Sequence, residues 1–459
     1  MRQLGKTLAV SFKTVLLASA LAVPAMSSAQ AVTLQEAITQ ALATNPDIGV
    51  VAHNREAVDE ELRQARGLYL PQIDLSAGAG IESNDDSTSR AGGGTGKHDV
   101  INPTDASITL QQRIFDGFEA GATVEREKAR VESAANRVQE NAEFLALDAI
   151  GAYLEVLRQR ELLDLAKNNL QIHIDIVANL QERLAGGGGS RADVSQSEAR
   201  AARARNTLTT TYNDLRDAEA NYTRIVGHFP EDLDTPEAFS SELPGGLDEA
   251  VDLAVNSNPT IRIFEADVRT AEAEVELSEV PFYPSVNLEA STEHRDEFDA
   301  TPGSYEQNNS VMLRLRWNLF RGGIDRAARQ EALARLSESK NQRYSSVVDA
   351  QREMRQSWFA LESNRQSVTD LASSVQYNTE TRDSYRDQFD VAQRTLLDVL
   401  DAENELFTSR GQLISAMTNE QLASYRILAL SGQLMANLGV QAPEQARVDH
   451  KSWADGLIE

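Results

Sequence analysis

Apolar residues return every seven positions through residues 118–184, a stretch that contains no proline. Two apolar columns three positions apart form a seam, which Gln159 and His173 interrupt. A period of seven rather than 3.6 predicts a helix that supercoils left-handedly against its neighbours. At 1.5 Å per residue this helix is about 100 Å long, so we expect an elongated structure. The columns are Ala135, Ala142, Ala149, Val156, Leu163, Leu170, Val177 and Leu184, and Val131, Val138, Leu145, Ala152, Ala166 and Leu180.

Two similar halves make up most of the chain. Matching residues lie 213 positions apart early in each half and 205 positions apart further on. This period is far longer than a solenoid unit, so it predicts a duplicated domain. Matching pairs include Leu34 with Leu247, Asn45-Pro46 with Asn258-Pro259, Phe115 with Phe320, Tyr153 with Trp358, Asp193 with Asp398 and Gly227 with Gly432.

Each half has the same predicted order of elements: a helix, two strands, a long helix and a shorter helix. In the first half these are residues 33–68, 72–82, 106–115, 118–184 and 191–226, and in the second 247–280, 285–292, 310–319, 322–389 and 395–432. The predicted divisions are a signal peptide (1–31), a first repeat (32–227), an equatorial connector (228–246), a second repeat (247–432) and an equatorial segment with a tail (433–459).

The lengths of the helices suggest how they pack. Segments 191–226 and 247–280 together match the length of one long helix, so we expect them to stack end to end beside it. Segments 395–432 and 33–68 are expected to stack likewise beside the other long helix. The proline-containing connector then lies partway along the rod and forms a belt with the C-terminal tail.

The four strand segments alternate between apolar and polar residues. In the clearest, Val311, Leu313 and Leu315 alternate with Arg314 and Arg316. About ten residues suffice for a tilted strand to cross a bilayer, and aromatic residues near the strand ends favour a membrane location. A half-buried hairpin of a soluble protein would show the same alternation. In lipid, four strands would leave open edges, so the chain must oligomerise, and three copies would supply twelve strands.

The amino terminus has a basic start, an apolar run and an Ala29-Gln30-Ala31 cleavage signal, which indicate a secretory signal peptide; an amphipathic cytosolic start is the alternative. Its removal takes the formal net charge from −26 to −29, which argues against a nucleic-acid partner. The absence of cysteine excludes disulfides, thiolate metal sites and a lipidated amino-terminal cysteine. The six histidines form no metal or catalytic motif, so we expect no enzyme, cofactor or metal site.

Two related segments, RTLLDVLDAENELF (394–407) and SRADVSQSEA (190–199), together with the order of elements, resemble the TolC family of outer-membrane channel proteins. The resemblance implies a mainly α fold with membrane β: a homotrimeric, twelve-stranded β-barrel continued by a twelve-helix coiled-coil α-barrel in the periplasm. It also implies export together with a periplasmic adaptor and an inner-membrane ABC or other transporter. The GGGGSRADV stretch (186–194) is similar to type I protein secretion members. Small-molecule efflux, and less readily a soluble periplasmic coiled-coil adaptor, are the alternatives.

Asp398 and Asp401 lie three residues apart and therefore on one face of a helix. A three-fold axis would gather six such carboxylates, a ring that attracts cations. The resemblance implies that they form the periplasmic gate, with Arg394 held by a carboxylate of the neighbouring hairpin and Asp193 at the matching place in the first repeat. A solvated acidic helix face is the alternative interpretation.

Two departures from the family pattern bear on this gate. Phe389 stands where a gating tyrosine is typical, and Ala192 replaces a hydroxyl residue that usually shares the arginine. An exposed ion pair contributes about 0.2–1 kcal/mol, so we predict a weakly latched gate that high salt loosens further.

The turns at the far end of the rod are the predicted adaptor contacts. Four consecutive glycines permit a close backbone approach in the first turn, although a flexible turn without a partner is the alternative. No G-K-[ST] follows them, so a phosphate-binding loop is excluded. The predicted contact residues are Gly186, Gly187, Gly188, Val391, Ala392 and Gln393.

Overall fold

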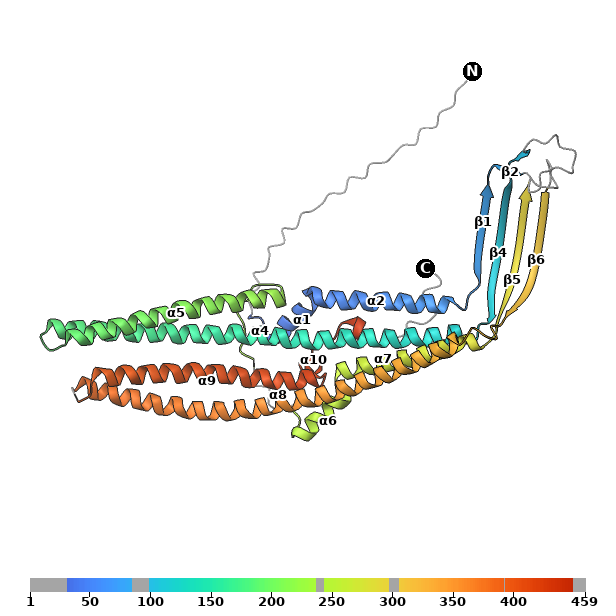
Figure 1. Cartoon of the computed structure of the whole chain (residues 1–459). Coiled ribbons are helices and arrows are strands. Elements are labelled where there is room, and N and C mark those ends of the chain that lie inside the picture. Colours follow the sequence, from blue (N-terminus) through green and yellow to red (C-terminus); the bar gives the residue numbers. More distant parts are fainter. Residues whose placement is uncertain (1–30, 85–98, 237–242, 297–304, 392, 449–459) are drawn as a thin grey trace, which may run out of the picture.

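The computed structural model describes residues 31–84, 99–236, 243–296, 305–391 and 393–448. A four-stranded antiparallel sheet stands at one end of a long helical rod (Figure 1). Apart from Ala31, the predicted signal peptide lies outside the described residues, as do residues 449–459 of the predicted tail.

The described elements follow the predicted order in both halves. The helices are α1 (Leu34–Thr44), α2 (Pro46–Gly67), α4 (Glu119–Ala185), α5 (Arg191–Val226), α6 (Leu247–Ser257), α7 (Pro259–Glu279), α8 (Ile324–Asp390), α9 (Leu396–Leu430) and α10 (Leu434–Asn437), with short 3₁₀ turns η1 (Val280–Phe282) and η2 (Glu444–Ala446). The strands are β1 (Gln72–Ala79), β2 (Glu82–Asn84), β3 (Asp99–Ile101), β4 (Thr104–Phe115), β5 (Ser285–Asp296) and β6 (Tyr305–Arg316).

The first helix predicted in each repeat is in fact two helices. Asn45-Pro46 divides α1 from α2, and Asn258-Pro259 divides α6 from α7. Proline lacks the N–H that a continuous helix needs, but it fits the first position of a new helix. The preceding asparagine caps that new helix: its side-chain oxygen accepts from Asp47 N at 2.9 Å in the first repeat and from Thr260 N at 2.9 Å in the second.

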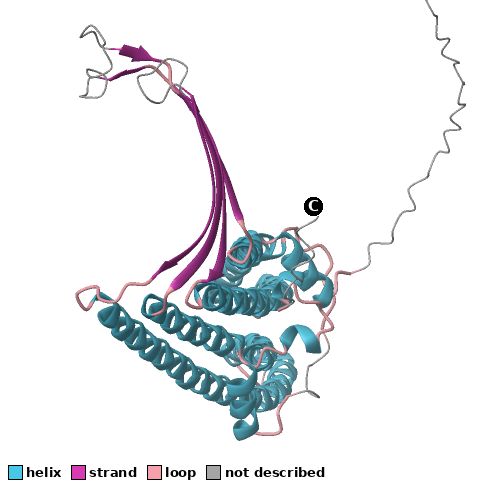
Figure 2. Cartoon of the chain, turned by 90° about the vertical axis from the view of Figure 1, so that its right-hand side faces the viewer, coloured by secondary structure: helices cyan, strands magenta, loops and turns pink. Residues whose placement is uncertain are grey.

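The predicted seam of α4 is confirmed. Ala135, Val138 and Ala142 are fully buried, and the polar interruptions Gln159 and His173 are buried with them. The helices of the rod pack side by side in one layer, which Figure 2 shows end-on. Helix α4 lies inside this layer and packs against α2, α5, α7 and α9. Helix α8 is just as long, at 67 residues, but lies at the edge of the layer and packs on α6, α7 and α9. Most of its surface is therefore exposed in a single chain.

The stacking of the shorter helices was predicted incorrectly. Helix α5 continues into α2, and α9 continues into α7, so each stack joins helices of the same repeat (Figure 1). Asn45 Nδ2 donates to Ile225 O at the end of α5, and Asn258 Nδ2 donates to Leu430 O at the end of α9, at 3.4 Å and 2.8 Å. The two ways of pairing the short helices have nearly equal total lengths, so helix length could not distinguish them. The asparagine side chains decide between them, because they donate to backbone carbonyls that the end of a helix leaves unpaired.

A glycine follows each of these helix ends. Gly227 and Gly432 have φ of +94° and +65°, which glycine adopts without strain. A Cβ on Gly227 would lie 2.7 Å from Thr44 Oγ1, and one on Gly432 would lie 3.0 Å from Ser257 O. Each junction between stacked helices therefore requires glycine, both for its left-handed backbone and because a Cβ would clash.

The sheet has the order β1-β4-β5-β6, with Leu75 opposite Ile108 and Leu288 opposite Leu313. Strands β5 and β6 extend four and five residues further toward their loop than predicted, because backbone pairing continues through polar residues. Strand β6 ends at Arg316, so Trp317 lies beyond it. Among the described strands, β1 and β6 each pair on one side only. Leu75 and Val311 are about three-quarters exposed, so the sheet presents apolar side chains that the chain itself leaves uncovered.

The main core lies midway along the rod, where the connector and the C-terminal segment cross the helices. Ile38, Tyr153, Tyr222 and Leu434 are fully buried there. The Tyr153 hydroxyl lies 2.7 Å from Val32 O and 2.7 Å from Asp234 O, which join the start of the first repeat to the connector. Among the described helices, none combines the length and the apolar character needed to cross a bilayer.

Candidate functional site

The end of the rod opposite the sheet contains two helix–helix turns, which we call the tips: residues 186–190 and 391–395 (Figure 1). In the first, the N–H groups of Gly186, Gly187 and Gly188 each donate to a carbonyl in the last turn of α4 at 3.0 Å. Gly187 has a φ of +82°, and Ser190 caps α5 by accepting from Ala192 N at 3.2 Å. The glycine turn is thus a hydrogen-bonded helix terminus.

The second tip presents Val391, which is 63% exposed. Gln393 N donates to Gln388 O at 2.8 Å and closes the end of α8. Ala392, one of the predicted adaptor contacts, lies outside the described residues.

Arg394 makes its contacts within its own hairpin. Its guanidinium lies 4.2 Å from the centre of the Tyr385 ring, donates to Gln388 Oε1 at 2.9 Å, and lies 3.7 Å from Asp398 Oδ2. Within one chain, therefore, the carboxylate beside Arg394 belongs to α9 and not to the other hairpin. Asp193, the expected counterpart, is half-buried in the first turn of α5 and forms no ion pair among the described residues.

Asp398 also completes the capping box of α9, whose N-cap is Thr395. It exchanges hydrogen bonds with Thr395, whose hydroxyl donates to Asp398 Oδ2 at 2.8 Å while Asp398 N donates back to Thr395 Oγ1 at 3.3 Å. The hydroxyl hydrogen bond, helped by the Thr395 N–H and the charge of Arg394, lowers the pKa of Asp398. The carboxylate therefore remains ionised at neutral pH.

Asp401 has a different partner. Arg200 of α5 donates from Nη2 to Asp401 Oδ1 at 2.7 Å and from Nη1 to Leu400 O at 3.4 Å. This contact joins the two repeats, because α5 belongs to the first and α9 to the second. The two carboxylates predicted to act together thus differ in surroundings: Asp398 faces its own turn, and Asp401 faces the other hairpin.

An apolar cluster joins the two hairpins next to the tips. Leu180 and Val194 of the first repeat pack with Leu396 and Leu400 of the second, and Phe389 packs against them. Arg183 lies 4.7 Å from the centre of the Phe389 ring and 3.5 Å from Asp390 Oδ1. Phe389, which replaces the expected tyrosine, therefore contributes apolar packing and a cation–π contact instead of a hydrogen bond.

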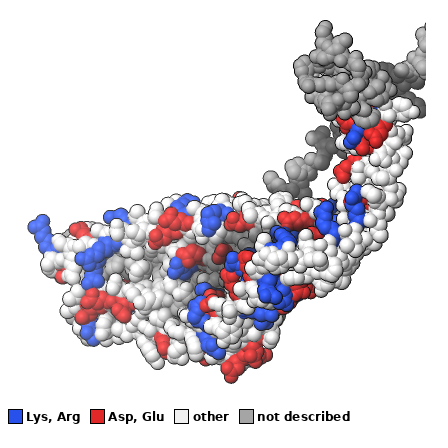
Figure 3. Space-filling view, turned by 45° about the vertical axis from the view of Figure 1, so that its right-hand side comes forward, with Lys and Arg blue, Asp and Glu red and all other residues white. Residues whose placement is uncertain are grey.

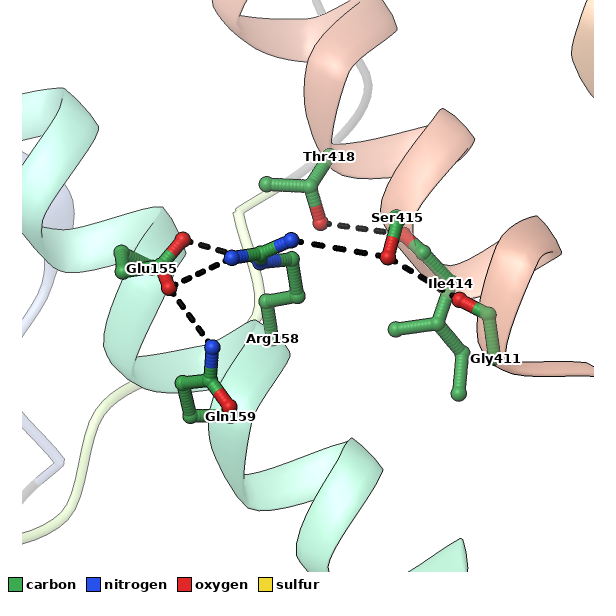
Figure 4. Close-up of polar contacts among 7 residues, drawn as sticks. All are labelled: Glu155, Arg158, Gln159, Gly411, Ile414, Ser415 and Thr418. Atoms are coloured by element: carbon green, nitrogen blue, oxygen red, sulfur yellow. Dashed lines mark hydrogen bonds and ion pairs between the residues drawn. The ribbon is translucent and has the colours of Figure 1, made fainter. Parts of the chain in front are cut away.

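The repeats are also tied halfway along the rod. Arg158 of α4 forms two hydrogen bonds with Glu155 and reaches Ser415 of α9 at 3.5 Å (Figure 4). Elsewhere, basic and acidic side chains lie in mixed groups on the face of the rod that Figure 3 shows. Many of them are i,i+3 pairs such as Arg63 with Glu60, each of which stabilises a helix by about 0.2–0.5 kcal/mol.

Sequence reasoning did not identify Arg200 or Arg183. Their positions in the second repeat are held by Glu405 and Gln388, so the duplication gives no signal for either arginine. Within the described residues no cluster of three or more His, Cys, Asp or Glu side chains could hold a metal ion.

A duplicated helical rod with a two-hairpin sheet at one end and two helical turns at the other is the architecture of a channel protomer. The solved outer membrane channel CmeC of Campylobacter jejuni has this fold, with a TM-score of 0.78, 14% identity, and coverage of 90% of this chain and 89% of that chain.

The sequence comparisons identify the family. A profile described as "Outer membrane efflux protein" matches residues 37–228 and 250–433. The outer membrane efflux protein BepC of Brucella suis is 27% identical over 91% of this chain and 89% of its own length. The proteases secretion protein PrtF of Dickeya chrysanthemi is 25% identical over 84% of this chain and 85% of its own length. The chain belongs to the outer membrane efflux protein family, a family of channel proteins located in the outer membrane.

Proposed function

We propose that three copies of this chain form a closed tunnel that exports substrates from an inner-membrane transporter to the cell exterior, as the outer-membrane component of a type I protein secretion system. The observation that supports this most directly is the unfinished sheet. Strands β1 and β6 pair on one side only, and the apolar side chains of the sheet are exposed. Unpaired strand edges are not tolerated in lipid, so the sheet requires further strands from other copies.

The rod supports the same proposal. Helix α8 lies at the edge of the layer with most of its surface exposed, although its repeat partner α4 is buried on several sides. Three chains arranged around an axis would cover this face and enclose a lumen. The periplasmic end of the tunnel would then be formed by the two tips, where Arg394, Asp398, Asp401 and Asp193 line the proposed gate.

The adaptor and the transporter are proposed from family membership together with the exposed tips. Gly186–Gly188, Val391, Ala392 and Gln393 are the proposed adaptor contacts. Similarity to PrtF, a protein of protease secretion, favours a type I system. Similarity to BepC, an efflux protein, supports small-molecule efflux as the second candidate.

The channel proposal is tested with detergent-extracted protein. Light scattering should give a trimer, negative-stain microscopy a particle with a rod, and planar bilayers a stable conductance. Arg394→Ala, and Asp398→Ala combined with Asp401→Ala, should raise the conductance by loosening the gate. Arg386→Ala is the matched control, since Arg386 is an exposed arginine of the same hairpin. A monomeric, water-soluble particle would refute the channel, and unchanged conductance in the gate variants would refute the gate alone.

The choice between secretion and efflux is tested in a deletion strain. Loss of a secreted protein with unaltered drug tolerance supports type I secretion, and the reverse supports efflux. Complementation with the wild-type chain should restore the lost phenotype. A variant with Val391→Asp and Gln393→Asp at the proposed adaptor contact should reach the outer membrane and fail to complement.

A further inference from the structure

We propose that Arg200 determines the charge selectivity of the tunnel entrance by neutralising Asp401, and that the same contact holds the second hairpin against the first. This inference rests on the proposed channel function. It changes the expected charge of the carboxylate ring. In each chain, Asp398 lies in its own turn beside Arg394 of the same hairpin, and Asp401 is compensated by an arginine of the opposite repeat.

The geometry fixes the arginine firmly. Two nitrogens of the Arg200 guanidinium meet α9 at different points, one on the Asp401 carboxylate and one on the Leu400 carbonyl. The Arg200 side chain is 21% exposed, whereas Asp401 is 61% exposed. A planar guanidinium held at two positions keeps its orientation better than a lysine ammonium would. The contact therefore places a fixed positive charge beside a carboxylate that is itself open to solvent.

The pair lies between a groove in the rod and the tips, on the same faces of α5 and α9 as residues that line the groove. A groove of about 610 Å³ is lined by residues of α4, α5, α8 and α9. Its lining includes Thr211 of α5, eleven residues beyond Arg200, and Thr408 of α9, seven residues beyond Asp401. Eleven and seven residues are about three and two helical turns. Arg200 and Asp401 therefore lie on the same faces of α5 and α9 as these groove residues, but nearer the tips.

The side of the layer opposite the groove is covered by another helix of the same chain. Helix α6 packs on α8 and α9 through Val251, Met354 and Ile427. Met354 faces a different side of α8 from the groove residues Ser367 and Leu371. Because α6 already covers the other flank, the groove is the open side that we place toward the lumen in a tunnel of three chains. The Arg200–Asp401 pair then lies where a permeating ion passes.

The neighbouring titratable side chains that contact these helices are neutral or already paired. His173 of α4 is the titratable side chain behind Arg200, and burial, together with the charge of Arg200, lowers its pKa, so it adds no charge at neutral pH. Glu198 bonds to Gln181, and Glu403 pairs with Arg382. Removing the Arg200 charge therefore leaves the Asp401 carboxylate uncompensated in each chain, or three such carboxylates per trimer.

Paired variants give this inference a specific signature in planar bilayers. Arg200→Gln should raise the K⁺/Cl⁻ permeability ratio by about two- to fivefold at moderate salt, because three uncompensated carboxylates then line the entrance. Asp401→Asn should lower the ratio by a similar factor, because three guanidinium groups are left uncompensated. The double variant should return to the wild-type ratio. All three should show a similarly raised conductance, since each breaks the same tie between the hairpins.

Two further variants separate charge from structure. Arg200→Lys retains the charge and loses the second contact, so its permeability ratio should remain near wild type while its conductance rises. Arg203→Gln, an exposed arginine three residues along the same helix, is the matched control. The inference is overturned if Arg200→Gln shifts the ratio no more than Arg203→Gln, or if the effects of Arg200→Gln and Asp401→Asn have the same sign. A wild-type protein without any conductance would overturn the proposed channel function itself, and this inference with it.

Discussion

Glu143 provides a sharp test of the packing around the middle of the rod. This carboxyl group is 1% exposed and lies where α10 crosses α4. Gln139 Nε2 donates to it at 3.0 Å and Met435 N at 3.4 Å. Burial raises the pKa of Glu143 to about 7, while the hydrogen bonds from the backbone N–H groups of Met435 and Leu434 and from Gln139 oppose the rise. Burial therefore penalises the ionised form more than these hydrogen bonds favour it, so the packing of the C-terminal segment on α4 is most stable when Glu143 is protonated.

The size and sign of the effect follow from this pKa. The folded state binds the Glu143 proton more tightly than the unfolded chain, whose glutamates titrate near 4.5. The stabilisation is therefore complete below pH 4.5 and is lost as the pH rises through 7. The rise in pKa from 4.5 to about 7 corresponds to about 3 kcal/mol of stability. Glu143→Gln keeps the shape and a hydrogen-bond acceptor but cannot ionise, so it should remove this dependence.

Hydrogen exchange followed by mass spectrometry measures the effect locally. In the detergent-solubilised protein, amides of residues 434–440 should lose protection progressively between about pH 4.5 and 7.5, after correction for intrinsic exchange. Glu143→Gln should retain it, with up to about 100-fold slower exchange than wild type at pH 8.5. Glu140→Gln, one turn earlier on α4, is the control and should behave as wild type. Equal protection of wild type and Glu143→Gln at pH 8.5 would refute the reasoning.

Three further substitutions test individual contacts. Asn258→Ala removes the cap of α7 and the bond to Leu430 O, and should destabilise the protein by about 1–2 kcal/mol, seen as a lower thermal unfolding midpoint. Tyr153→Phe removes the hydroxyl shared by Val32 O and Asp234 O; a cost of about 1 kcal/mol should appear as faster proteolysis of the connector. Gly187→Ala should cost about 1–2 kcal/mol and speed amide exchange at the first tip, whereas Gly188→Ala, where φ is not positive, should not. Unaltered behaviour in any of the three would contradict the corresponding contact.

The candidate site was predictable only in part. The sequence motif located Asp398, Asp401 and Arg394 near a helix start, and the turn residues were found from their glycines. It did not reveal that Asp398 bonds to Thr395 or that Asp401 bonds to Arg200. Arg200 is one of several arginines in α5, at spacings that mark none of them, and its partner lies 201 residues away.

The sequence by itself determined the order and type of the elements, except that the first helix predicted in each repeat is two helices. The seven-residue period required a long supercoiled helix, strict alternation identified the strands, and the duplication supplied the second copy of each. These patterns are local because they depend on which face of an element meets apolar neighbours. Tertiary structure decided which helices stack, since the two pairings had nearly the same length. Contacts between distant residues, such as the bonds from Asn45 and Asn258 to carbonyls of the preceding helices, distinguish them. It also decided which charges meet at the tips, because an ion pair depends on side chains that folding brings together from separate repeats.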